Sequence, residues 1–309
     1  MAAKEYKAFN FNFMGGVKPA LALTTLLVII SIGASIFKGF NFGVDFTGGT
    51  LVELGYESEP DLNDIRQALT ESEFKNATVQ RFGTPTDVLV RLPPTGDQAA
   101  ASVSHRVIEL LPGAELRRIE FVGPQVGDEL AESGVLALLF AFGGIFLYVM
   151  LRFTWKFSVG AIVATMHDVV ITIGYFAVTG REFDLTVLAA VLAVLGYSLN
   201  DTVVVFDRVR ENLRKMRKTS SVQEVVNAAL NQTLSRTLMT SGETMLAVLA
   251  LLFFGGELLH GFSIALVIGI LVGTYSSIYV ATATVVWLGI SRQEMMPVVK
   301  EGAQADERP

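Results

Sequence analysis

Six long apolar segments dominate the pattern of hydrophobic and polar positions along the chain. A helix needs about 20 mostly apolar residues to cross a hydrocarbon core of about 30 Å, because lipid offers no hydrogen-bond partner for a backbone amide. Segments of this kind are predicted at 19–37, 134–151, 157–178, 185–206, 237–254 and 262–290. The pattern therefore predicts a membrane α-helical bundle of six transmembrane helices.

The stretch between the first two spans has the pattern of a small folded α+β domain. Alternating and β-branched runs predict strands, and runs with helical periodicity lie between them. The strands are expected at 50–56, 77–82, 88–92 and 117–122, and the helices at 62–69 and 103–111. The order strand, helix, strand, strand, helix, strand is that of a ferredoxin-like domain, which we place at 39–130.

Basic residues in the short loops predict the orientation of the spans, because Lys and Arg accumulate on the cytoplasmic side. They gather between spans two and three, between spans four and five, and after span six: Arg152, Lys156, Arg208, Arg210, Arg214, Lys215, Arg217, Lys218, Arg236, Arg292 and Lys300. The loops 179–184 and 255–261 together contain one basic residue, Arg181. We therefore expect both termini, 1–18 and 291–309, in the cytoplasm and the folded domain on the periplasmic side.

A further helical pattern joins spans four and five over 219–234. Ser221 and Glu224 have the spacing of a capping box, and an apolar stripe with i, i+3, i+4 and i+7 spacing follows. We expect an amphipathic cytoplasmic helix that lies in the membrane interface and bends into span five. We interpret it as a structural elbow rather than as a partner site.

Composition supports a membrane protein and excludes several other classes. Of 309 residues, 51% are hydrophobic and 17% charged, which leaves little polar surface for a soluble protein of this length. The net charge of -6 argues against nucleic-acid binding, and the absence of cysteine removes thiolate chemistry. Zinc-binding, phosphate-binding and G-x-S-x-G motifs are missing. We expect neither an enzyme, a metal nor an organic cofactor, although aspartates on spans three and four leave an intramembrane protease as an alternative.

The few ionisable residues inside the spans are candidate functional residues, because each charge there costs about 2.5–3.5 kcal/mol. Span four carries Asn200 and Asp201, and Arg236 lies near the start of span five. Burial in lipid favours the protonated form of a carboxyl group, whereas a nearby arginine favours the ionised form. An aspartate between these influences can load and release a proton. The alternative is a fixed ion pair of Asp201 and Arg236 that only joins two helices.

Span three carries the neighbours His167 and Asp168. Adjacent positions on a helix point about 100° apart, so we do not expect these two side chains to act as one dyad. His167 can belong to a proton path, contact another helix or face water, and Asp168 can accept a hydrogen bond from Thr165 or Thr172. A place on the proton path stays open for His167, Asp168 and Asn200.

Four stretches resemble signatures of the SecD/SecF family of protein-export membrane proteins. The run from Gly43 to Thr50, GVDFTGGT, resembles the family motif that leads from the first span into the first strand. Its characteristic residues are Gly43, Asp45, Phe46, Thr47, Gly48 and Gly49. RIEFVGPQVG at 118–127, GYSLNDTVVVFDRVREN at 196–212 and RTLMTS at 236–241 resemble the SecF forms of the corresponding segments. The resemblance covers nearly the whole chain, and the motif at 196–212 is its most specific part.

This resemblance implies a subunit of the Sec translocase in the bacterial inner membrane. It would act with SecD as a heterodimer beside the SecYEG channel, and use the proton-motive force to promote late steps of export of a translocating polypeptide. Further small subunits such as YajC and the insertase YidC are expected companions. SecD would supply the second half of a transporter-like assembly. In that picture protons are the coupling ion, Asp201 is their carrier, Arg236 is its charge partner and Thr240 is a polar neighbour.

Two other functions stay open at this point. The chain can be a passive subunit that stabilises the translocase, with its ionisable residues serving packing alone. It can also be half of a proton-driven exporter of a small molecule or a lipid. Export that persists with a neutral residue at position 201 would favour the first, and a solute whose efflux depends on the chain would favour the second.

Overall fold

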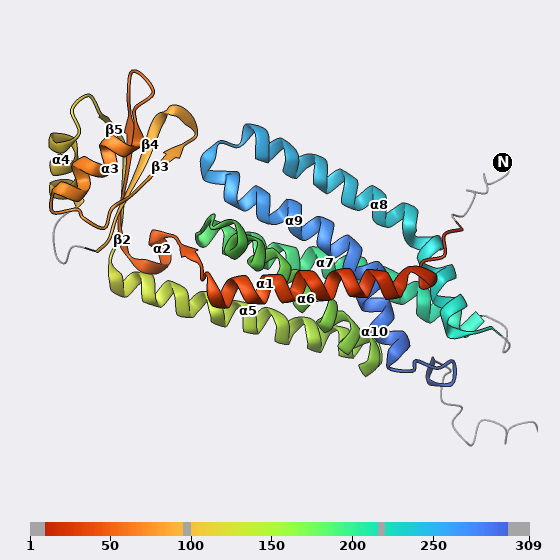
Figure 1. The fold of residues 1–309 in the computed structure, drawn as a ribbon. Coiled ribbons are helices and arrows are strands. Elements are labelled where there is room, and N and C mark those ends of the chain that lie inside the picture. The colour runs from red at the N-terminus through yellow and green to blue at the C-terminus, as the bar shows by residue number, and fades with distance from the viewer. Residues whose placement is uncertain (1–9, 95–99, 216–219, 296–309) are drawn as a thin grey trace, which may run out of the picture.

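The computed structural model describes residues 10–94, 100–215 and 220–295 (Figure 1). Within these ranges, six helical segments are long and apolar enough to cross a membrane. They are α1 (Val17–Phe37), α5 (Pro124–Arg152), α6 (Trp155–Thr179), α7 (Leu185–Lys215), α8 (Val222–Phe254) and a last crossing made of α9 (His260–Ser276), a π-helical segment (Ser277–Ala281) and α10 (Thr282–Trp287). The predicted six-helix bundle with an inserted α+β domain is confirmed.

The bundle has an inner and an outer set of helices. In the most apolar stretches of α6, α7 and the last crossing, 61%, 50% and 50% of the residues are buried, against 17% or less for α1, α5 and α8. Close approach of the inner helices depends on small residues. A Cβ at Gly269 of α9 would collide with Val194 of α7, and one at Gly160 of α6 would lie 2.6 Å from Val285 Cγ2 of α10.

The inserted domain lies at one end of the bundle, and the start of α1 lies at the other (Figure 1). Its elements are β2 (Gly49–Gly55), α3 (Leu62–Glu71), β3 (Thr78–Phe82), β4 (Thr84–Leu92), α4 (Ala100–Leu110) and β5 (Glu115–Val122). The antiparallel sheet has the strand order β3-β4-β2-β5, which is ferredoxin-like. Alternate residues such as Val52 and Val90, which pair across β2 and β4, are fully buried against the two helices.

The domain is connected to the bundle by a short structured joint. The joint contains β1 (Asn41–Phe42) and α2 (Val44–Thr47), and β1 pairs in parallel with β6 (Glu182–Phe183), which lies between α6 and α7. Gly48 and Gly49 have φ values of +67° and +128°, which residues with a Cβ rarely adopt. A Cβ at Gly48 would lie 2.9 Å from Pro124 Cα at the start of α5. The glycine pair therefore lets the two chain segments that enter and leave the domain touch.

The helices extend beyond several of the predicted spans. α5 begins at Pro124 instead of 134, and α7 continues to Lys215 instead of 206. Charged residues mark where lipid ends, but they are good helix formers and do not end a helix. Hydropathy therefore located the membrane crossings better than the helix ends.

The capping box at the start of α8 is confirmed, since the Ser221 hydroxyl accepts from Glu224 N and the Glu224 carboxylate from Ser221 N. The predicted link is the first part of α8 rather than a separate helix, and its placement in the membrane interface stays a prediction. α8 is continuous over 33 residues, and the apolar stripe of its first turns, including Val226 and Leu230, is buried in the bundle core. An apolar stripe has the same spacing whether it meets lipid or a neighbouring helix. Some predictions fall on positions outside the described residues. These positions are residue 219 of the link, the basic residues Arg217, Lys218 and Lys300, and the terminal stretches 1–9 and 296–309.

Replacing Gly49 by alanine tests the joint. We expect Gly49→Ala to lower the free energy of unfolding by about 1–3 kcal/mol, because a left-handed backbone would carry a Cβ that collides with the Leu92 carbonyl oxygen. Titration with a denaturing detergent, followed by circular dichroism, measures the change. Gly143→Ala on α5 is the control, since a Cβ there meets nothing within 4 Å. Equal effects of the two substitutions would contradict the assigned backbone constraint.

Candidate functional site

Asp201 on α7 is a buried carboxylate with hydrogen-bond donors from two other helical segments. Its side chain is almost enclosed, with 7% of the residue exposed. The Thr237 hydroxyl of α8 donates to Oδ1 at 2.6 Å, and the Ser277 hydroxyl of the π-helical segment donates to Oδ2. Neutral hydroxyls, rather than a cation, therefore hold this carboxyl group inside the bundle.

Arg236 does not form the ion pair with Asp201 that one interpretation of the sequence required. Within the described ranges no salt bridge joins the two residues, and the arginine acts on the carboxyl group only as a nearby charge. Arg236 and Asn200 instead line a polar cavity of about 380 Å³ between α7 and α8, together with Arg152, Asp207, Arg208, Glu211, Gln232 and Thr233. The cavity brings polar groups into the part of the bundle next to Asp201.

Thr240 does not contact Asp201. It is exposed, and its hydroxyl donates to the backbone carbonyls of Arg236 and Thr237 on its own helix, each at 3.0 Å. The hydroxyl that bonds Asp201 belongs to Thr237, three residues earlier and on the buried face of α8. The hydroxyl that bonds Asp201 therefore belongs to Thr237 on the expected helix, and a role of Thr240 in proton coupling stays a prediction.

Asp168 on α6 is a second enclosed carboxylate, with no exposed surface. Its Oδ1 lies 2.8 Å from His167 Nδ1, and its Oδ2 accepts from Ser276 Oγ of α9 at 2.8 Å and from the Ser198 hydroxyl of α7. The other ring nitrogen of His167 bonds the Thr24 hydroxyl of α1. One cluster of polar side chains therefore connects four helices.

One expectation about Asp168 is wrong, and a second is confirmed in part. His167 and Asp168 do form a dyad, because the 100° angle applies to the Cα–Cβ directions and the imidazole ring is long enough to reach its neighbour. Asp168 accepts a hydrogen bond from Thr172, but through its backbone carbonyl, and Thr165 donates to the carbonyl of Ala161. A threonine one turn along a helix reaches the i−4 carbonyl more readily than a side chain.

The hydroxyl groups that complete both sites were not predicted. Four of the six spans carry these five hydroxyls, as Thr24, Ser198, Thr237, Ser276 and Ser277. Most serine and threonine hydroxyls in membrane helices bond to their own backbone, so their presence alone does not indicate a side-chain partner. The one available cue was that Ser276 and Ser277 are adjacent in a crossing without charged residues.

The residues of the glycine motif lie at the joint, far along α7 from Asp201. The Asp45 carboxylate accepts from Leu185 N at 2.9 Å, and Asp184 accepts from Val187 N at 2.8 Å, so two carboxylates cap the first turn of α7. Gly43 N donates to the Phe183 carbonyl at 2.9 Å. Thr47 bonds to the carbonyl of Gly43 at 3.1 Å. This motif therefore fixes the domain to the start of α7.

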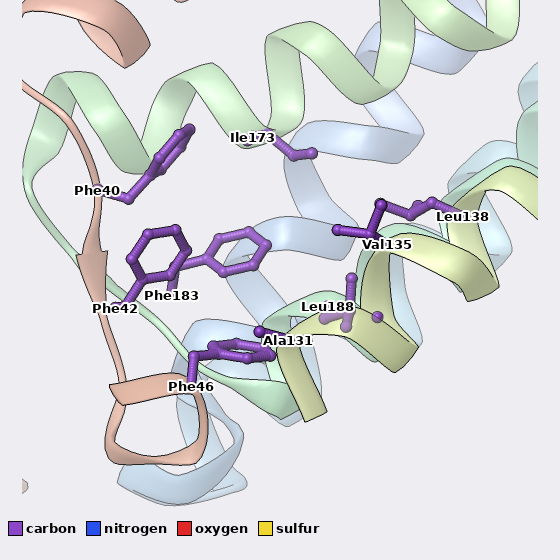
Figure 2. Close-up of a pocket in the computed structure, with 10 residues that line it drawn as sticks. Phe40, Phe42, Phe46, Ala131, Val135, Leu138, Ile173, Phe183 and Leu188 are labelled. Atoms are coloured by element: carbon purple, nitrogen blue, oxygen red, sulfur yellow. The ribbon is translucent and has the colours of Figure 1, made fainter. Parts of the chain in front are cut away.

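An apolar pocket of about 300 Å³ adjoins the joint. Figure 2 shows the rings of Phe40, Phe42, Phe46 and Phe183 gathered at one side, with Phe46 directed toward Ala131 of α5. Neighbouring ring centroids lie 5.5–6.2 Å apart. These aromatic contacts reinforce the pairing of β1 with β6.

An ion pair reaches from the sheet of the domain to the joint. Arg91 of β4 pairs with Glu182 of β6 and donates from Nη1 to the Phe42 carbonyl at 2.8 Å. Burial raises the pKa of Glu182, and the Arg91 guanidinium opposes that rise. Removing Arg91 would therefore leave a carboxylate in a place where its charged form is poorly solvated.

Comparison with known proteins identifies close similarity over nearly the whole chain. Residues 103–291 match the family model described as protein export membrane protein SecD/SecF, C-terminal, and residues 33–59 match the SecD/SecF GG motif. The protein translocase subunit SecF of Pseudomonas aeruginosa is 49% identical over 98% of this chain and 99% of its own length. The corresponding subunit of Escherichia coli O157:H7 is 44% identical over 95% and 93%.

Solved structures show the same similarity. A crystal structure of SecDF from Thermus thermophilus, described as a translocon-associated membrane protein, superposes with a TM-score of 0.83 at 43% identity. It covers 91% of this chain, whereas this chain spans only 39% of the SecDF chain. A SecDF structure described as a super-membrane-facing form gives a TM-score of 0.67 at the same identity and coverage.

The two threonines on α8 provide a matched pair of substitutions. Thr237→Val removes a donor from a buried carboxylate, so we expect it to lower the free energy of unfolding by about 1–3 kcal/mol. Thr240→Val removes only bonds to its own backbone at an exposed position, and we expect a change within about 0.5 kcal/mol. Unfolding in denaturing detergent measures both. A larger loss for Thr240→Val would contradict the assigned contacts.

Proposed function

The chain belongs to the SecD/SecF family of protein-export membrane proteins, and from this premise we propose that it couples proton flow to a late step of export. It is a SecF-type multi-pass subunit for transport rather than an enzyme. The coupling ion, the carrier residue and the route from carrier to exported chain are the proposed parts.

We propose SecD as the heterodimer partner. This fold covers 39% of the solved SecDF chain. The rest of that chain is long enough to hold a second, SecD-type half. The sparsely buried helices α1, α5 and α8 offer apolar surface for lipid and for that partner. The assembly would act beside the SecYEG channel, with YajC and YidC as further partners. Both termini would lie in the cytoplasm and the α+β domain in the periplasm, facing the translocating polypeptide.

The observation that carries proton coupling is the enclosed Asp201 with two hydroxyl donors and no paired cation. The ionised carboxylate accepts hydrogen bonds from both hydroxyls. When it is protonated, it can donate its own proton to the oxygen of one of these hydroxyls, so both protonation states can be hydrogen-bonded at this position. Arg236 and Asn200, on the wall of the polar cavity, supply a nearby charge and a polar route. His167 and Asp168 are proposed members of the same proton path.

The energy available from proton flow is sufficient for such a switch. One elementary charge that crosses the membrane potential contributes about 2.3 kcal/mol per 100 mV. That amount shifts a two-state equilibrium by roughly fiftyfold, because about 1.4 kcal/mol corresponds to a factor of ten. A few protons can therefore reset a moving domain.

The proposed route to the exported chain runs along α7. Asp201 lies about 24 Å along the helix from Leu185, at 1.5 Å for each residue. Leu185 N bonds Asp45, and β6 beside it pairs with β1 and with Arg91. A shift of α7 on protonation of Asp201 would therefore act directly on the joint and on the α+β domain, which we propose holds the emerging polypeptide.

Replacing Asp201 by asparagine tests the proposed carrier. We expect Asp201→Asn to abolish the gradient-dependent part of secretory-protein release and to leave the gradient-independent part, because asparagine cannot exchange a proton. Release is measured from proteoliposomes that hold the chain with SecD, with and without a proton gradient. Asp128→Asn is the control for the loss of an acidic side chain, since Asp128 is exposed at the start of α5 and does not line the polar cavity. Normal gradient-dependent release by the Asp201 variant would make the chain a passive structural subunit.

Arg91 tests the proposed route. We expect Arg91→Ala to reduce gradient-dependent release by about 2- to 30-fold at unchanged membrane level, because the joint loses its ion pair and a bond to β1. Arg81→Ala, which removes an exposed pair with Glu59 in the same domain, should have little effect. The same assay measures both variants. Equal release by the two would mean that the domain contact at Glu182 does not transmit the motion.

A further inference from the structure

The two enclosed carboxylates lie on different helices but share one turn of the last crossing. Ser276 donates to Asp168 at 2.8 Å, and its neighbour Ser277 donates to Asp201. Ser198, three residues before Asp201 on α7, also donates to Asp168. The two carboxyl groups are thus connected both through α7 and through an adjacent serine pair.

Each serine of this pair has a second acceptor within reach. Ser276 Oγ lies 3.1 Å from the Gly273 carbonyl oxygen, and Ser277 Oγ lies 2.9 Å from that of Thr274. A hydroxyl has one proton to donate, so it donates either to its carboxylate or to its own backbone. A carboxyl group that takes up a proton becomes a donor to the serine oxygen, and the serine proton can then turn to the backbone carbonyl. The protonation state of each carboxyl group therefore sets which groups donate and which accept, and with it the strength of the bonds between the helices.

The Asp168 and His167 dyad has the same property. With a neutral ring, Nδ1–H donates to Asp168 and Nε2 accepts from Thr24; with a charged ring, both nitrogens donate. The groups that meet the dyad from α1, α7 and α9 are the hydroxyls of Thr24, Ser198 and Ser276. Among the described residues no Lys or Arg pairs with Asp168, so its charge is not fixed by a permanent cation.

We propose that Asp168 and His167 form a second proton-binding site, and that the Ser276–Ser277 pair couples this site to Asp201. The two carboxyl groups then take up protons as one interacting pair rather than independently. The coupling works through the hydrogen bonds of the shared turn and the charge of the neighbouring group. This inference rests on the proposed function only in taking Asp201 as the proton carrier.

Carbodiimide modification tests the coupling, because the reagent reacts with protonated carboxyl groups in apolar surroundings. The assembly with SecD is treated over a range of pH, and peptide mass spectrometry gives the modified fraction of Asp201. Glu243, an exposed carboxylate on α8, serves as the reference within each sample. We expect Asp168→Asn to move the pH of half-modification of Asp201 down by about one unit, because a neighbouring negative charge is gone.

The serine variants separate coupling from a general loss of structure. Ser277→Ala removes a donor from ionised Asp201 and should move half-modification to higher pH. Ser276→Ala favours the protonated, neutral form of Asp168 and should move it to lower pH, in the direction of Asp168→Asn. Ser263→Ala is the matched control, since Ser263 is buried on the same helix and has no hydrogen-bond partner in the described structure.

An Asp201 curve that Asp168→Asn and Ser276→Ala leave at the wild-type pH would overturn the proposal. The same holds if Ser263→Ala moves the curve as far as Ser276→Ala, because the shift would then reflect a loosened helix. The export assay answers a separate question. Gradient-dependent release by Asp201→Asn would refute Asp201 as the carrier, whereas the modification curves report the coupling between the two carboxyl groups in either case.

Discussion

A carboxyl group inside the bundle must obtain its hydrogen bonds from neighbouring helices, because hydrocarbon supplies none. Asp168 and Asp201 together use donors from α6, α7, α8, α9 and the π-helical segment. The helices that contribute most of them, α6, α7 and the last crossing, are also the most deeply buried. The arrangement of the inner helices is therefore tied to the polar groups they enclose, and a change in proton occupancy bears on the packing of the whole inner set.

The start of α7, at Leu185, is held by a different kind of constraint. Asp45 and Asp184 cap its first turn, and the glycine pair Gly48–Gly49 brings the entering chain against the start of α5. The most recognisable motif of the sequence is thus structural in its chemistry and lies at the opposite end of α7 from the polar cavity. α7 therefore carries the joint to the α+β domain at its start and the enclosed Asp201 several turns further along.

The length of the apolar runs and the periodicity of the strands predicted the fold well, because both reflect which side chains face lipid, water or the protein core. Runs of about 20 apolar residues located the six crossings, and the alternation at residues such as Val52 and Val90 located the sheet. The start of α8 was harder, since its apolar stripe fits lipid and the bundle core equally well. Hydropathy also could not place the helix ends in polar surroundings.

The site was predicted only through its rare charged residues. Asp168 and Asp201 stand out because ions are costly in lipid, whereas the hydroxyls that hold them are common in membrane helices and usually bond to their own backbone. Thr237 and Thr240 differ by less than one helical turn, and only the packing of α8 on α7 decides which one meets Asp201. The contact of His167 with Asp168 depends on ring reach rather than on position. Partner choice among small polar groups is a property of the folded bundle.

The π-helical segment that begins at Ser277 sets the orientation of the end of the last crossing. A π turn contains one residue more than an α turn, so its return to α geometry would rotate everything that follows by about 100° and advance it by about 1.5 Å. α10 follows immediately, and its Val285 packs against Gly160 of α6 so closely that no Cβ fits between them. The serine that bonds Asp201 is therefore the first residue of the segment that sets the rotation of α10 against α6.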